Sequence, residues 1–161
     1  MKFDQFEFLT QQTFGQINSD GSPTMRFADI LPDRLHPLVL AYVGDAVFNL
    51  YVRTRLLNFE QNRVRVLHGH GAKMVSATLQ AYALRQVEQE LTEKERDIIR
   101  RGRNAKANVP KSASVSDYRS STGFEALLGY LFLEGNNVRV NDIAERCFVI
   151  ISRKLTNIDE S

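Results

Sequence analysis

Apolar side chains recur at three- and four-residue spacing through most of the chain, which predicts helices. No segment shows the strict alternation of a half-buried strand, and no internal repeat occurs, so the sequence predicts an all-α fold. Five helices are expected: about His36 to Leu56, Val64 to Glu90, Thr92 to about Arg101, about Ser120 to Glu134, and Val138 to Leu155.

Several residues indicate where these helices begin and end. Thr92 and Glu95 form a capping-box pattern, and we expect Gly102 to end the helix that they start. The second helix carries an apolar stripe, and we expect any break near its start, at His68–Gly71. Residues 104–116 are expected to form a loop. These limits define a domain over residues 34–155, preceded by an extension over 1–33 that is flexible or partly helical, and followed by a tail over 156–161.

Two acidic residues interrupt apolar helix faces. With a helical repeat of about 3.6 residues, Asp45 shares a face with Leu38, Ala41, Tyr42, Phe48 and Val52, and Glu125 with Ser121, Thr122, Leu128, Gly129 and Phe132. A carboxylate at a helix–helix contact is unfavourable unless it is paired, hydrogen-bonded or bound to a metal. Neither face carries a nearby Lys or Arg. The pattern therefore favours one shared cation site with oxygen ligands, which suits magnesium or manganese.

The alternative is that each acid is simply exposed or capped, which is the commoner situation for a lone acid in an apolar helix. Glycine beside both acids favours the shared site: Gly44 precedes Asp45, and Gly123 and Gly129 lie around Glu125. Glycine inside a helix costs about 1 kcal/mol relative to alanine. Close approach of the two helices would explain these glycines and would bring the acids together.

Composition is that of one globular domain: 161 residues, 43% hydrophobic and 25% charged. The single cysteine, Cys147, excludes an intrachain disulfide and suits a reducing cytoplasm. No apolar run reaches the roughly 20 residues that span a bilayer, and the N-terminus has no signal-peptide core. Phosphate loops followed by Lys-Ser/Thr, Cys–His signatures and nucleophile elbows are absent from the sequence.

The net charge of +2 hides an uneven distribution. Residues 98–119 carry six basic side chains against one acid, and residues 50–73 carry five against one, so the two windows are +5 and +4 and the remainder is −7. Concentrated positive charge on an otherwise acidic chain indicates a polyanionic partner. A solvated basic face is the alternative.

The segments Leu40–Phe48 and Phe124–Phe132 resemble the two signature helices of the ribonuclease III catalytic domain. Arg101–Lys106 and Tyr118–Thr122 are similar to the short bacterial variant called Mini-III, which has that domain without a double-stranded-RNA-binding domain. The resemblance covers about residues 34–155. Full-length relatives have two further acids, where this chain has Ala41 and Thr122; Mini-III proteins share this loss, which leaves the number of metal ions open.

The resemblance implies that Asp45 and Glu125 are the catalytic, metal-binding pair. It implies Mg²⁺ as cofactor, with Mn²⁺ as a substitute, and cleavage of double-stranded RNA to 5′-phosphate and 3′-hydroxyl ends. The implied substrate is precursor 23S ribosomal RNA, with a ribosomal protein as a further partner. Residues suited to the RNA backbone are basic or amide side chains in and beside the loop: Arg101, Arg103, Asn104, Lys106, Lys111 and Arg119.

Tyr42 matches the position at which relatives insert an aromatic side chain into a partner subunit, which implies a homodimer; the alternative is that Tyr42 packs in its own core. Two other functions stay open. Loss of two acids is also what a catalytically silent RNA-binding or assembly module on this fold would show. A helical phosphohydrolase acting on nucleotides ranks last, because the chain lacks a His-Asp pair at ligand spacing.

Overall fold

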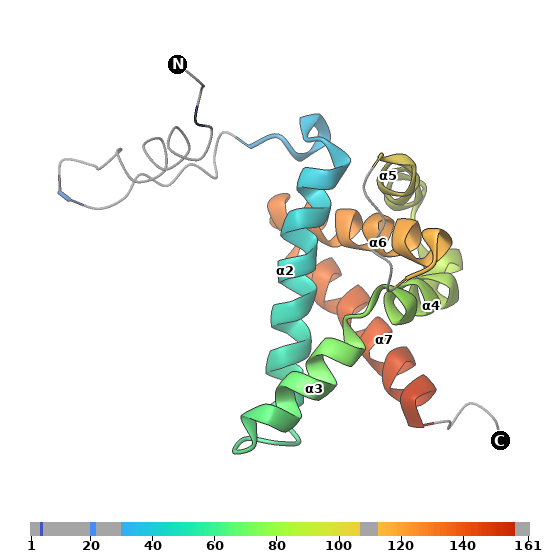
Figure 1. The fold of residues 1–161 in the computed structure, drawn as a ribbon. Coiled ribbons are helices and arrows are strands. Elements are labelled where there is room, and N and C mark those ends of the chain that lie inside the picture. The colour runs from blue at the N-terminus through green and yellow to red at the C-terminus, as the bar shows by residue number, and fades with distance from the viewer. Residues whose placement is uncertain (1–3, 5–19, 22–29, 107–112, 157–161) are drawn as a thin grey trace. The chain divides into compact units, whose positions relative to one another are not determined.

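The computed structural model describes residues 30–106 and 113–156, together with Asp4, Asp20 and Gly21 (Figure 1). The chain divides into two units, Met1–Ile30 and Leu31–Ser161, and all of the described helices belong to the second unit. Most of the expected N-terminal extension, most of the expected C-terminal tail, and Lys111 lie outside the described residues.

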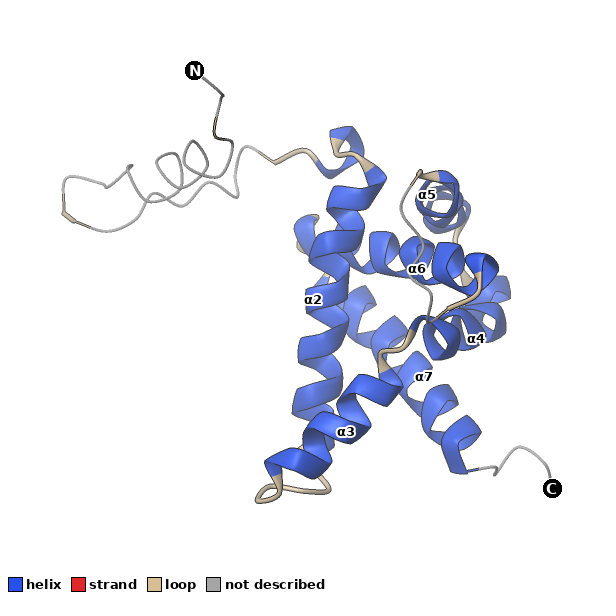
Figure 2. Cartoon of the chain, viewed as in Figure 1, coloured by secondary structure: helices blue, strands red, loops and turns tan. Residues whose placement is uncertain are grey.

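The second unit is all-α, as predicted, and its described residues contain no strand (Figure 2). The helices are α2 (Pro37–Leu56), α3 (Val64–Met74), α4 (Ala77–Val87), α5 (Glu93–Asn104), α6 (Val115–Leu133) and α7 (Asn137–Thr156), with short 3-10 turns η2 (Pro32–Arg34) and η3 (Glu88–Glu90). The predicted limits of α2 and α7 agree with the structure to within one residue. Pro37 occupies the first turn of α2, where its missing N–H leaves no bond unmade.

Helix α6 is the centre of the fold, and α2, α4, α5 and α7 all pack against it (Figure 1). Every residue from Ser120 to Leu131 is buried except Glu125. This all-round burial explains why α6 is apolar on every face rather than along one stripe. Glu125 is therefore a carboxylate in the most enclosed helix of the domain.

The crossing of α2 and α6 requires glycine on both helices at the contact. A Cβ atom on Gly44 would lie 1.7 Å from the Glu125 carbonyl oxygen, and one on Gly129 would lie 1.9 Å from the Leu40 carbonyl oxygen. The predicted close approach is confirmed for these two glycines. Gly123 allows the close approach of α5 rather than of α2, because a Cβ atom on it would lie 2.8 Å from the Ile99 carbonyl oxygen.

Three predicted limits were wrong. Gly102 does not end α5, which continues to Asn104; a Cβ there would lie 2.8 Å from the Cα of Gly123, so Gly102 is a packing residue. Helix α6 begins at Val115, five residues before the predicted Ser120, because the Ser114 hydroxyl accepts a hydrogen bond from the Asp117 N–H at 3.0 Å.

The third error concerns the predicted single helix from Val64 to Glu90, which is two helices. The chain breaks at Val75 and Ser76, where Ser76 is extended (ψ 145°), and not at His68–Gly71. The break leaves the Val75 carbonyl without a helical donor, and the Gln80 side-chain amide donates to it at 2.9 Å. Neither residue at the break is a glycine or a proline, so no local helix breaker marks the separation of α3 from α4 in the sequence.

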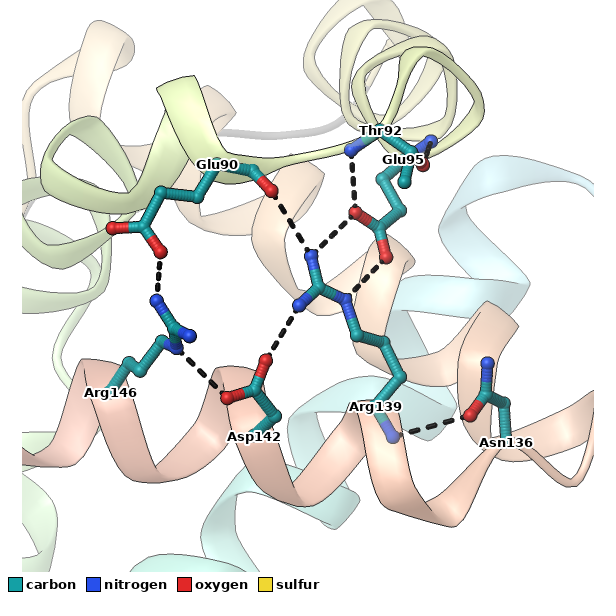
Figure 3. A network of polar contacts seen from close by, with 7 residues as sticks. All are labelled: Glu90, Thr92, Glu95, Asn136, Arg139, Asp142 and Arg146. Atoms are coloured by element: carbon teal, nitrogen blue, oxygen red, sulfur yellow. Dashed lines mark hydrogen bonds and ion pairs between the residues drawn. The ribbon is translucent and has the colours of Figure 1, made fainter.

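A polar network joins the start of α5 and η3 to α7 (Figure 3). The predicted capping box is present: the Glu95 N–H donates to the Thr92 hydroxyl at 3.2 Å, and the Thr92 N–H donates to Glu95 Oε2 at 2.8 Å. Arg139 of α7 donates to both oxygens of Glu95, at 2.8 and 2.9 Å. This arginine lowers the pKa of the buried Glu95 carboxyl and compensates its charge. The network thus holds α5 and α7, which both pack against α6, in a fixed relative position.

Candidate functional site

Asp45 and Glu125 flank the point where α2 and α6 approach most closely. Asp45 directly follows Gly44, and Gly44 faces the backbone carbonyl of Glu125. The two carboxylates are near enough for the Asp45 charge to raise the pKa of Glu125. The structure therefore brings together the two acids that the sequence singled out.

The two acids differ in exposure. Glu125 is largely enclosed, and burial, followed by the Asp45 charge, raises its pKa to about 8, while a hydrogen bond with Gln80 opposes the rise. Asp45 is exposed, and its Oδ1 accepts a hydrogen bond from Asn49 Nδ2 at 2.9 Å. The expectation of two acids on buried helix faces was wrong for Asp45: its neighbours Tyr42 and Ala46 are exposed too, so this edge of α2 faces solvent.

Ala41 and Thr122, the two positions noted in the sequence, add no carboxylate to the site. Ala41 is buried, and the buried Thr122 donates its hydroxyl to the Tyr118 carbonyl at 2.9 Å. In the part of the chain that the structure describes, no cluster of three or more His, Cys, Asp or Glu side chains could hold a metal. The site thus has two carboxylates, with the amides of Asn49 and Gln80 beside them.

This donor set fits a hydrated magnesium ion. Mg²⁺ is commonly held by one or two carboxylates and keeps several waters or substrate oxygens. A cation beside Glu125 would replace the proton that burial and Asp45 favour, and it would offset the repulsion between the carboxylates. The buried Oε1 of Gln80 has no hydrogen-bond partner among the described residues. A polar atom near the acid pair is therefore left without a partner, as is expected where a ligand or water binds.

A groove between α2 and α3 begins near Asp45, and its largely apolar lining carries one arginine and one histidine. The groove has a volume of about 450 Å³, and its lining includes Asn49, Arg53 and His68. Since Asn49 also donates to Asp45, the groove and the acid pair are continuous. Arg53 and His68 are exposed. Arg55, two residues after Arg53, is held in a bidentate contact with Glu145 at 2.9 and 3.0 Å and is not available to a ligand.

The residues predicted to bind RNA from α5 lie apart from the acid pair. Arg101 is half-buried and donates to the Leu35 carbonyl at 3.4 Å, whereas Arg103 is exposed, with Glu88 at 4.0 Å. The stem of Arg103 approaches Gly123, on the face of α6 turned toward α5. Glu125 is two residues further, about 200° around the helix. Asn104, Lys106 and Arg119 are exposed.

Tyr42 is 80% exposed, which contradicts the alternative that it packs in its own core. It lines a second groove, of about 710 Å³, between α2 and α7, and Asp45, Leu50 and Phe132 line the same groove. Leu50 and Phe132 are exposed, as is Val138 at the start of α7. An apolar surface therefore borders Asp45, and it meets the groove between α2 and α3 at Thr54, which lines both.

Sequence reasoning missed the two amides. Gln80 was placed on no apolar stripe, although a polar residue inside a buried helix segment is a signal that could have singled it out. Asn49, four residues after Asp45, could have been found from the helical repeat, because residues four apart share a face. None of the described helices is long and apolar enough to cross a membrane.

Comparison with known proteins gives concordant results. The Ribonuclease III domain family matches residues 38–136. A protein named "Mini-ribonuclease 3" from Symbiobacterium thermophilum is 47% identical over 130 residues, which is 80% of this chain and 98% of that protein. A protein of the same name from a Thermoanaerobacter species is 47% identical over 118 residues, 73% of this chain and 83% of that one. The crystal structure of a Fusobacterium nucleatum protein superposes with a TM-score of 0.66 at 26% identity, covering 75% of this chain and 95% of that one.

Proposed function

The chain belongs to the ribonuclease III family, and from that premise we propose that it is a magnesium-dependent endoribonuclease that cleaves double-stranded RNA. Mn²⁺ is proposed as a substitute ion. The observation that carries the proposal is the Asp45–Glu125 pair at the glycine crossing, where a carboxylate is kept in an enclosed position that raises its pKa to about 8. A partly enclosed acid whose pKa is strongly raised beside a second acid is typical of a functional site.

Asp45 and Glu125 would hold the ion, and Asn49 would keep Asp45 oriented through its 2.9 Å hydrogen bond. A divalent ion held by carboxylates activates a water and stabilises charge on the phosphate and on the leaving oxygen. Glu125 must be ionised to bind the ion, so ion binding must displace the proton that this carboxyl holds near neutral pH. The proposed products have 5′-phosphate and 3′-hydroxyl ends.

RNA contact is proposed for two surfaces. The groove between α2 and α3, which Arg53 and His68 line, adjoins Asp45 through Asn49 and would receive the backbone near the cut. A second set of side chains, on α5, just after α5 and on α6, would contact the duplex further from the cut through phosphates and 2′-hydroxyls. These residues are Arg101, Arg103, Asn104, Lys106 and Arg119, and also Lys111, which lies outside the described residues. Such contacts position a duplex and carry little sequence information.

A homodimer is proposed from the apolar surface beside the acid pair. Tyr42, which is 80% exposed, lines the groove between α2 and α7, and Val138, which is 84% exposed, directly follows the lining residue Asn137. Exposed apolar surface of this kind is typical of an interface between subunits. A second copy related by a twofold axis would place two acid pairs on one assembly, which matches the two strands of a duplex.

The substrate proposed is precursor 23S ribosomal RNA in the cytoplasm, with a ribosomal protein as a further partner. The names of the relatives support a ribonuclease without naming this RNA. For the domain organisation we propose a catalytic domain over 34–155, flanked by the extension over 1–33 and the tail over 156–161.

A catalytically silent RNA-binding or assembly module is the second candidate, favoured by Ala41 and Thr122 at the positions where full-length ribonuclease III enzymes, unlike Mini-III proteins, have acids. Thr122 is buried and its hydroxyl is bonded within its own helix, so it does not replace the missing carboxylate. Against this candidate stands Glu125, because a module without metal chemistry gains nothing from an enclosed carboxylate.

The proposal is tested by incubating the purified protein with a structured RNA duplex and Mg²⁺, followed by mapping of the cut ends. Asp45→Asn and Glu125→Gln should each abolish cleavage and leave helical content and duplex binding intact. Glu93→Gln, an exposed acid on α5, is the matched control and should cleave normally. Near-normal turnover by either site variant would contradict the assignment, and a wild-type protein that binds the duplex without cutting it would support the silent module.

A further inference from the structure

Gln80 is a primary amide buried next to the acid pair. It lies in the first turn of α4 and is 1% exposed. Its Nε2 donates at 2.9 Å to the Val75 carbonyl, which the break between α3 and α4 leaves without a helical donor. The side chain is therefore held at one end by the backbone of the junction.

Packing does not account for an amide at this position. Gln80 Oε1 is buried and has no hydrogen-bond partner in the described part of the chain, which is unfavourable for a polar oxygen. Methionine or leucine would fill a similar volume without a buried polar oxygen. The reason for an amide at this position must therefore lie with its Nε2, which donates one hydrogen to the Val75 carbonyl and has a second hydrogen for another group.

That second group is Glu125. The Gln80 side chain lies near enough to the Glu125 carboxyl to lower its pKa as a hydrogen-bond donor, while its Nε2 also donates to the Val75 carbonyl at 2.9 Å. An amide nitrogen has two hydrogens, so one can be held by the Val75 carbonyl while the other is directed at the carboxylate. The bond links the α3–α4 junction to the position of Glu125 on α6.

A hydrogen-bond donor beside a carboxylate that binds a cation should be uncharged. A Lys or Arg beside Glu125 would compete with a bound cation, and a third acid would add repulsion to a pair whose charges already oppose each other. An amide orients the carboxylate and does neither. In a site with only two acids, orientation of each carboxylate matters more, because no further protein ligand corrects it.

We propose that Gln80 is a positioning residue that fixes the Glu125 carboxylate for binding of a divalent cation, by sharing its amide between Glu125 and the Val75 carbonyl. The inference rests on the proposed function, since it assigns a role at the same metal site. Groups that orient metal ligands typically change metal affinity or activity by about 10–100-fold when they are replaced.

The test measures Mn²⁺ binding in the absence of RNA, by electron paramagnetic resonance of the free ion, for the wild-type protein, Gln80→Met and Gln86→Met. Gln86 is an exposed glutamine on the same helix and is the matched control. Gln80→Met should bind Mn²⁺ about 10–100-fold more weakly, with helical content retained. In cleavage assays its kcat should fall while KM for the duplex stays unchanged, and Gln86→Met should match the wild type in both assays.

A Gln80→Met protein that folds and binds Mn²⁺ as tightly as the wild type would overturn the inference, even if cleavage by the wild type confirms the proposed function. A wild-type protein that binds Mn²⁺ but does not cut RNA would overturn the function alone. A wild-type protein that binds no Mn²⁺ would overturn both. Should Gln80→Met fail to fold, the side-chain amide resonances of the wild-type protein are followed by NMR during Mg²⁺ titration. The Gln80 pair should shift and that of Gln86 should not, and an unmoved Gln80 pair would overturn the inference.

Discussion

Replacing Glu125 with Gln should stabilise the metal-free protein at neutral and alkaline pH. Burial and the Asp45 charge raise the pKa of Glu125 from 4.5 to about 8, whereas in the unfolded chain the carboxyl returns to its ordinary value. Between these two values the native state holds a proton that the unfolded state has lost. Stability therefore falls as pH rises through this window, and this carboxyl contributes no further change above about pH 8.

The magnitude follows from the width of the window. Each pH unit corresponds to about 1.4 kcal/mol, so a window of roughly 3.5 units sets a ceiling of about 5 kcal/mol. Partial solvent access at Glu125 screens the charge and lowers this figure. We expect the wild type to lose about 2–3 kcal/mol between about pH 5.5 and 7.5 through this carboxyl. The neutral amide of the Glu125→Gln variant has nearly the same shape and should not show this loss.

The assay is urea unfolding followed by far-ultraviolet circular dichroism, in EDTA, at several pH values and one protein concentration. All other titrating groups are shared, so the difference between the two proteins isolates Glu125. Asp45→Asn should give an intermediate pH dependence, because it removes the neighbouring charge and leaves the burial. Saturating Mg²⁺ should stabilise the wild type at about pH 7.5 and not the Glu125→Gln variant. Parallel stability curves for wild type and Glu125→Gln across this pH range would refute the reasoning.

Three further predictions test the packing, the proposed dimer and the proposed RNA surface. Gly129→Ala should destabilise by about 3 kcal/mol in urea unfolding, because its Cβ would lie 1.9 Å from a backbone oxygen that cannot move aside. Gly69→Ala, whose Cβ meets nothing within 4 Å, is the control and should be neutral or stabilising. Tyr42→Asp should shift the sedimentation of the protein from dimer to monomer at micromolar concentration, and unaltered sedimentation would argue against the interface. The third prediction concerns the triple replacement of Arg101, Arg103 and Lys106 with Ala. The slope of log K against log salt concentration for duplex binding should become shallower by up to ~0.9 for each lost phosphate contact. An unchanged slope would mean that these side chains face away from RNA.

The sequence by itself was sufficient for the all-α class, the extents of α2 and α7, the capping box at Thr92, and the pairing of Asp45 with Glu125. Each of these depends on local spacing: helical periodicity, a cap three residues from its partner, or glycine next to an acid. Such signals act within a few residues and leave a pattern that the sequence displays directly.

Tertiary packing decided the rest. Neither residue at the Val75–Ser76 break is a glycine or a proline, so the sequence does not predict the break. The Gln80 side-chain amide donates a hydrogen bond to the Val75 carbonyl, which the break leaves without a helical donor. Gly102 reads as a helix end in isolation, yet it continues α5 because Gly123 of α6 must approach it. Asp45 lies on an apolar face by periodicity, and its exposure depends on where the neighbouring helices stop covering α2. For Gly102 and Asp45 the deciding factor is the placement of helices that are distant in the sequence, and no local pattern encodes that placement.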